Sequence, residues 1–196
     1  MTELENHPDF EPSASIEEMD AAVADALLPY ASKAAFQTVG TISDLSDQEP
    51  LYAAAAGVLV AGAVMRDGPT WRLGTRVLAS HLLATALRGV VKRLVDRTRP
   101  EAAARRGNYV MREGHRHESD FNSFPSGHTA GAVAVAMAVS RENPGARLPA
   151  AALAALSGTA QVIRSRHYVT DVVAGAIIGV AADALVDALI ERAKKV

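Results

Sequence analysis

The feature that most constrains the fold of this sequence is a succession of nearly charge-free segments separated by turns rich in proline and glycine. Two of them, Leu51 to Met65 and Thr129 to Val139, contain no charged residue. No stretch shows a convincing alternation of apolar and polar residues, the pattern typical of a half-buried strand. We therefore predict an all-α fold.

Helix-breaking residues divide the chain into six predicted helices. Pro50 precedes the second helix, Asp67-Gly68-Pro69 follows it, and Asn143-Pro144-Gly145 ends the fourth. The predicted helices cover residues 19–42, with an interruption at Pro29, and residues 51–65, 73–95, 126–143, 149–163 and 171–195. Residues 1–18 are predicted to be a disordered acidic tail. Residues 19–196 form one helical domain, in which 98–124 is a long polar loop.

The sequence favours a bundle that spans a membrane over a soluble one. A span needs about 20 mostly apolar residues, and the third and sixth segments are interrupted by charges such as Arg88 and Asp183. However, a soluble domain of 196 residues rarely needs so many charge-free segments. Small residues on these segments allow the close helix packing found in lipid; they are Gly57, Gly62, Gly131, Gly175 and Gly179.

Composition excludes several other classes of function. A formal net charge of −2 gives no electrostatic basis for binding nucleic acid. The absence of cysteine excludes disulfides and thiolate metal sites. The polar N-terminus lacks the features of a cleavable signal peptide.

The distribution of basic residues predicts an orientation in the membrane. Basic residues are enriched in cytoplasmic loops, and three connections or ends carry them: Arg66, Arg72 and Arg76; Arg141 and Arg147; Arg192, Lys194 and Lys195. These ends are predicted to be cytoplasmic in a multi-pass protein of the cell membrane. The opposite helix ends, which carry the motifs described next, are then on the outer face.

Three clusters of polar residues lie at the edges of the apolar segments. Lys92 is followed after six residues by Arg99-Pro100, the second cluster is Pro125-Ser126-Gly127-His128, and His167 is followed after three residues by Asp171. Cations neutralise phosphate, and a helix start at Ser126 and Gly127 offers free N–H groups to an anion. A histidine oriented by a carboxylate can act as a nucleophile, and a second histidine can act as the general acid that protonates a leaving oxygen.

In this order and spacing the clusters resemble the motifs of the type 2 phosphatidic acid phosphatase family, over roughly residues 50 to 190. The resemblance implies a membrane phosphatase that acts on a lipid phosphate or isoprenoid diphosphate without metal or organic cofactor. It implies that His167 attacks phosphorus, that Asp171 orients it and that His128 protonates the leaving oxygen. Lys92, Arg99, Ser126 and Gly127 would bind the phosphate.

The third motif departs from the family pattern. The position six residues before His167, usually arginine, holds Gln161, and Ala160 replaces the usual serine. A glutamine cannot offset phosphate charge. If the helix continues past Ile163, Arg164 shares a face with Gln161 and His167 and is the first candidate for a replacement; Arg166 is the second.

Three alternatives to an active membrane phosphatase remain open. One is a relative that binds lipid phosphate without turnover, which the glutamine favours. A soluble acid phosphatase of the same family and a vanadate-dependent haloperoxidase, which resembles the family in its site, are the others. His115 and His117, with Glu113, Glu118 and Asp120, also permit a metal site in the polar loop, although solvated side chains are the preferred interpretation.

Overall fold

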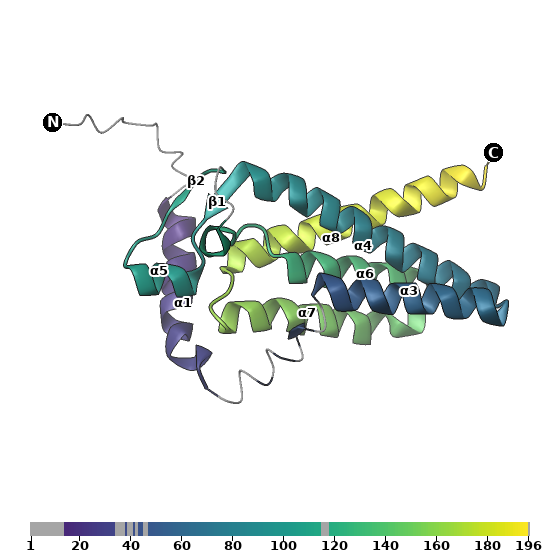
Figure 1. Ribbon diagram of the computed structural model, residues 1–196, viewed down its shortest axis with the longest axis horizontal. Helices are drawn as coiled ribbons and strands as arrows, with labels where there is room; N and C mark the ends of the chain where they lie inside the picture. The colour runs from purple at the N-terminus through teal and green to yellow at the C-terminus, as the bar shows by residue number, and fades with distance from the viewer. Residues whose placement is uncertain are drawn as a thin grey trace.

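The structure is a computed structural model that describes residues 14–33, 38, 41, 43, 44, 47–114 and 118–195. Five helices form a bundle along its long axis (Figure 1): α3 (Gln48–Met65), α4 (Gly68–Leu94), α6 (Gly127–Glu142), α7 (Arg147–Ile163) and α8 (Val169–Ala193). Helix α1 (Ala14–Ala31) lies across one end of this bundle, near the short α5 (Pro100–Arg106). The all-α prediction is confirmed, with seven α-helices in the described residues instead of six.

The ends of the bundle helices follow from local capping. The Asp67 carboxylate accepts a hydrogen bond from the Thr70 amide at the start of α4, and the Ser126 hydroxyl accepts one from the Thr129 amide at the start of α6. Arg66 adopts a left-handed conformation after α3, with φ of 53°. The predicted bounds of these helices are therefore close to those observed.

The prediction was less accurate for the first helix. Helix α1 begins at Ala14, so residues 14–18 are helical and do not belong to a disordered tail. Pro29 lies in the last turn of α1, which ends at Ala31, so the chain leaves the helix close to the predicted interruption. Residues 1–13 lie outside the described residues, as do most of residues 34–46.

The segment 98–124 is more ordered than the predicted polar loop. Strand β1 (Val95–Arg97) pairs antiparallel with β2 (Met111–Glu113), with Asp96 opposite Arg112. Helix α5 lies between the two strands in the sequence, and a 3₁₀ turn (Ser119–Phe121) follows β2. The sequence showed no strand pattern here, because strands of three residues are too short to show an alternation and the buried residues of β1 are polar.

Helix α6 is the centre of the bundle and packs against α4, α7 and α8. Its contacts with α8 are made by backbone: a Cβ added at Gly175 would lie 2.5 Å from the Ser126 carbonyl oxygen, and one at Gly179 would lie 2.7 Å from that of Ala130. The core between the helices is built largely from alanine, so the helix axes approach closely. By contrast, Gly57 has no neighbouring atom within 4 Å of an added Cβ and makes no such contact.

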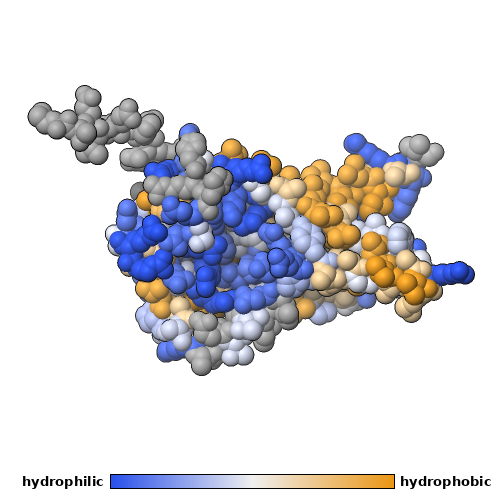
Figure 2. Space-filling view, in the orientation of Figure 1, coloured by the Kyte–Doolittle hydropathy of each residue, from blue (hydrophilic) through white to orange (hydrophobic). Residues whose placement is uncertain are grey.

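On the face shown in Figure 2, apolar side chains gather over the helices of the bundle, whereas the end that carries α5 and the two strands is polar. Two helices, α3 and α8, are long and apolar enough to cross a membrane. Large apolar side chains are exposed along four helices: Val60, Val64 and Met65; Trp71, Leu82, Val90 and Leu94; Leu148, Leu153 and Leu156; Val173, Ile177, Val180, Leu185 and Leu189. Exposure on this scale is unusual for the surface of a soluble monomer.

Candidate active site

The three sequence motifs converge at the polar end of the bundle, which we call the site end. The first motif lies at the end of α4 and the start of α5, the second at the start of α6, and the third between α7 and α8. A backbone hydrogen bond of 3.0 Å from the Ser126 amide to the Asp171 carbonyl joins the second motif to the third. The Ser123 amide donates to the Arg97 carbonyl and so joins the second motif to the strand between α4 and α5.

The His167 side chain is buried and held in one orientation. Its Nδ1 lies 2.7 Å from the backbone carbonyl oxygen of Ser123. A carbonyl oxygen can only accept a hydrogen bond, so Nδ1 carries the proton and Nε2 keeps its lone pair. Burial lowers the pKa of His167 from its usual value, although Asp171 and the Ser123 carbonyl oppose this shift. The structure therefore presents a neutral imidazole, as a nucleophile requires.

Asp171 acts on His167 mainly through neighbouring groups. The sequence predicted that Asp171 accepts the hydrogen bond of the His167 Nδ1–H. Its Oδ2 lies 3.6 Å from this Nδ1, whereas the Ser123 carbonyl oxygen lies at 2.7 Å and is the nearer acceptor. The Asp171 Oδ2 accepts hydrogen bonds from the Ser123 hydroxyl and from the Tyr168 amide. Asp171 thus fixes the two residues that position the imidazole.

Arg97 is a component of the site that the motif spacing did not indicate. This fully buried guanidinium donates to Asp171 at 2.7 Å and to Asp20 of α1 at 2.8 Å, and it lies over the Tyr168 ring at 4.2 Å from the centroid. The attraction of Asp171 raises its pKa, against the effect of burial, which acts in the opposite direction. Arg97 therefore holds Asp171 in place and docks α1 onto the site end. No signal in the sequence linked Asp20 to this position.

The second motif forms a turn at the start of α6, which we expect to bind an anion and call the anion-binding turn. Ser126 is the N-cap and is fully buried, and its hydroxyl also accepts from that of Thr129 at 3.0 Å. His128 follows Gly127 in the first turn of the helix, and its Nε2 lies 3.9 Å from both Asp44 and Asp47. This Nε2 is buried and has no hydrogen-bond partner in the part of the chain that is described. It is thus available to a ligand.

Positive charge gathers beside this turn. Lys92 and Arg99 repel one another, and Arg88, one helical turn before Lys92, repels both. The Arg99 Nε donates to the Ser119 carbonyl at 3.0 Å. Burial, followed by repulsion from Arg166 and Arg88, lowers the pKa of Arg99. No ion pair between described residues involves Lys92, Arg99 or Arg88, which leaves a concentrated positive charge.

Arg164 and Arg166, the two candidates for the third-motif cation, do not lie on one helix face with Gln161 and His167. Gln161 is buried, and its Nε2 donates to the Ser43 hydroxyl at 3.0 Å. Helix α7 ends at Ile163, so Arg164 does not continue on its face, and its guanidinium pairs with Asp44 at 2.6 Å. Arg166 is about half exposed, with its Nε 3.7 Å from Glu101. Arg164 still acts electrostatically on His128, so it borders the site without lying at the predicted place.

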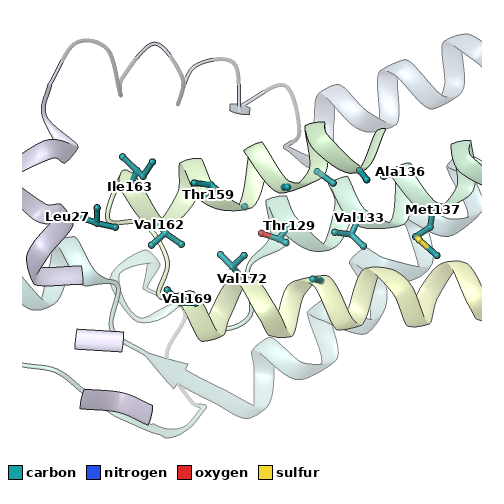
Figure 3. A pocket seen from close by; sticks show the side chains of 15 residues that line it. Leu27, Thr129, Val133, Ala136, Met137, Thr159, Val162, Ile163, Val169 and Val172 are labelled. Carbon is teal, nitrogen blue, oxygen red and sulfur yellow. The ribbon is translucent and has the colours of Figure 1, made fainter. Parts of the chain in front are cut away.

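An apolar groove of about 590 Å³ begins beside the site (Figure 3). It runs between α6, α7 and α8, from Leu27 of α1 toward Met137. Thr129 and Val172, each the residue that follows a predicted catalytic residue, contribute to its wall near the site end. An alkyl chain matches such a lining, because almost no polar atom faces it.

Within the described ranges, no group of three or more His, Asp or Glu residues is placed to hold a metal ion. His115 and His117 lie outside the described residues, so a metal site in the segment 98–124 is not tested. A metal-free site stays a prediction.

Comparisons with known proteins agree with the sequence motifs. The sequence profile of the PAP2 superfamily matches residues 73–194, more than half of the chain. A transmembrane PAP2-type phosphatidylglycerolphosphate phosphatase from Bacillus subtilis has a similar fold, with a TM-score of 0.64 and 23% sequence identity over 92% of this chain and 88% of that one. No curated protein matches the sequence with significance.

Proposed function

Because this chain belongs to the PAP2 superfamily, we propose that it is a membrane phosphatase that hydrolyses a lipid phosphate or diphosphate through a phosphohistidine at His167. The observation that carries this proposal is the neutral, buried imidazole of His167, whose Nδ1–H is bound by the Ser123 carbonyl. This nucleophile stands beside cations that have no carboxylate partner among the described residues. Both features serve a reaction in which a phosphoryl group accumulates negative charge.

The first half of the reaction forms the phosphoenzyme. The lone pair of the His167 Nε2 attacks phosphorus, and the bond from phosphorus to the leaving oxygen breaks. His128 donates a proton to that oxygen as it leaves. Asp44 and Asp47, each 3.9 Å from the Nε2 of His128, favour the protonated form that this transfer requires. Lys92, Arg99 and the amides at the start of α6 bind the phosphoryl oxygens.

The second half returns the enzyme to its starting state. His128, now neutral, takes a proton from water, and the water oxygen attacks phosphorus. The phosphorus–nitrogen bond breaks, its electron pair returns to the Nε2 of His167, and inorganic phosphate leaves. Throughout, the Ser123 carbonyl and Asp171 stabilise the positive charge that develops on the His167 ring.

Two features support a lipid substrate in a membrane. The exposed apolar side chains of α3, α4, α7 and α8 form a surface that lipid would cover. The apolar groove would hold an alkyl chain of a substrate whose phosphate lies at the start of α6. With the basic helix ends in the cytoplasm, the site end would face outward, where phosphate is released.

Phosphate release from a panel of lipids tests this function. The panel contains phosphatidic acid, phosphatidylglycerol phosphate and an isoprenoid diphosphate, presented in detergent with EDTA to the full chain. We expect release from wild type that survives EDTA and falls to background in His167→Ala. Release that EDTA abolishes, or that His167→Ala retains, would contradict the mechanism.

Gln161 favours a second candidate, a relative that binds lipid phosphate without turning it over. Its amide is engaged by Ser43 and offers no charge. This candidate predicts phosphate binding without release in wild type and a sharp gain of release in Gln161→Arg. The active phosphatase predicts little gain from that substitution, provided that another residue supplies the missing charge.

A further inference from the structure

Arg88 lies in α4 one helical turn before Lys92, and its side chain reaches the anion-binding turn. A Cβ added at Gly127 would lie 3.0 Å from the Arg88 Cζ, 3.2 Å from its Nε and 3.3 Å from its Nη2. The guanidinium therefore packs directly on the glycine between Ser126 and His128. Any larger residue at position 127 would displace it.

The Nε of Arg88 has no acceptor among the described residues, although Asp47 attracts the guanidinium from beyond ion-pair distance. This Nε is buried, and within the described part of the chain neither a hydrogen bond to this atom nor an ion pair to this side chain is formed. Buried arginines elsewhere are compensated: Arg97 binds Asp20 and Asp171, and Arg76 binds Glu142 and Asp187. Arg88 itself is half-buried, so the cost to the folded state falls on the buried Nε, which has no acceptor. A phosphoryl oxygen would remove that cost.

We infer that Arg88 binds the phosphoryl group in the place that Gln161 leaves without a cation, so that the third-motif charge comes from α4 instead of α7. This inference rests on the proposed function and names a further ligand of the same site. Gln161 is bound to Ser43 and Arg164 to Asp44, whereas Arg88 faces the turn that carries His128. Its planar fork can contact two phosphoryl oxygens at once.

The test compares Arg88→Gln and Arg88→Lys with Arg93→Gln, an exposed arginine of the same helix, in the purified full chain. We expect Arg88→Gln to lower kcat/KM by about 10²- to 10³-fold, as loss of an anion-stabilising donor does. Its inhibition constant for inorganic phosphate should rise by about tenfold or more. Arg88→Lys should fall between wild type and Arg88→Gln, because it keeps the charge without the fork. Arg93→Gln should behave as wild type.

Thermal melting separates binding from folding. Because the Nε of Arg88 is buried without an acceptor, Arg88→Gln should leave the melting temperature unchanged or raised. Phosphate inhibition and kcat/KM within threefold of wild type in Arg88→Gln would overturn the inference. A more than tenfold gain in kcat/KM in Gln161→Arg would also overturn the inference, because it would show that wild type lacks the third-motif positive charge. If Arg88→Gln fails to fold, Arg88→Lys provides the test. A reduced kcat/KM and weaker phosphate inhibition in Arg88→Lys would support the inference, and wild-type values of both would overturn it.

Failure of the proposed function gives a different result. If wild type releases no phosphate from any lipid of the panel, calorimetry with inorganic phosphate tests the site alone. Binding by wild type that is lost in Arg88→Gln would support the role of Arg88 in anion binding. Equal binding by both proteins, or none by wild type, would overturn it.

Discussion

Two arginines at the site end are in opposite electrostatic situations. Arg97 is enclosed by Asp20 and Asp171 and stabilises the group that positions His167. Arg88 has no ion-pair partner in the described residues and lies against Gly127. The first arginine is part of the scaffold of the site, and the second adds to the charge that a phosphate would neutralise. Position in the chain does not distinguish these roles; only the neighbouring carboxylates do.

The ionisation of His167 gives a prediction at the scale of one residue. Because burial is the largest influence and lowers its pKa, the imidazole should stay neutral as pH falls through 6.5, the ordinary value for histidine. It should protonate only at lower pH, and nucleophilic activity should be lost there. Titration of the ring signals by NMR, assigned with His167→Asn, measures this directly. A midpoint at or above 6.5 would show that the imidazole is not held neutral.

At the scale of elements, the long helices and the three motifs could be predicted from the sequence, because apolar length and breakers such as Pro144, which follows α6, act locally. Helix α5 and the strand pair could not, since Asp96 and Arg97 are polar residues buried by partners far away in the sequence. The dependence of Asp171 on Asp20 was hidden for the same reason. The role of Arg88 requires knowing that α4 ends against α6.

The apolar groove gives a prediction for α7 and α8. Ala155 lines the groove, whereas Ala152 is exposed on the same helix outside it. Ala155→Trp should fill part of the groove and raise KM for a long-chain lipid phosphate severalfold, with little effect on a short-chain substrate that does not reach it. Ala152→Trp, with the same added bulk, should leave both unchanged. Equal effects of Ala155→Trp on long and short chains would exclude the groove as the chain-binding site.

At the scale of the whole molecule, the two ends of the bundle contain different charge arrangements. Opposite the site end, Arg76 pairs with Glu142 and Asp187, and Arg141 pairs with Asp183 and Asp187. These pairs join α4, α6 and α8 by charges that neutralise one another. The site end also has ion pairs, such as those of Arg97, but no described carboxylate lies within ion-pair distance of Lys92, Arg99 or Arg88. The ion pairs at the opposite end therefore stabilise the packing of the helices, whereas the cations at the site end can bind an anion.

This division predicts that stability and catalysis can be separated. Asp183 is fully buried against Arg141 and Ser80. Asp183→Leu should lower the unfolding free energy by about 1–3 kcal/mol, because it leaves the Ser80 hydroxyl without its acceptor and Arg141 with Asp187 alone. Below its melting temperature the variant should keep its phosphatase rate, because the change lies far from His167. Thermal melting and activity in detergent measure both. Glu191→Gln, at an exposed pair on the same helix, should change neither.

Trapping the phosphoenzyme tests the mechanism most directly. Wild type would be mixed with a lipid phosphate, quenched within the first turnover at alkaline pH, where phosphohistidine persists, and digested for mass spectrometry. We expect phosphate on the peptide that contains His167 and none there in His167→Ala. Rapid phosphate release without a phosphorylated His167, or with phosphate on another residue, would contradict the assignment of the nucleophile.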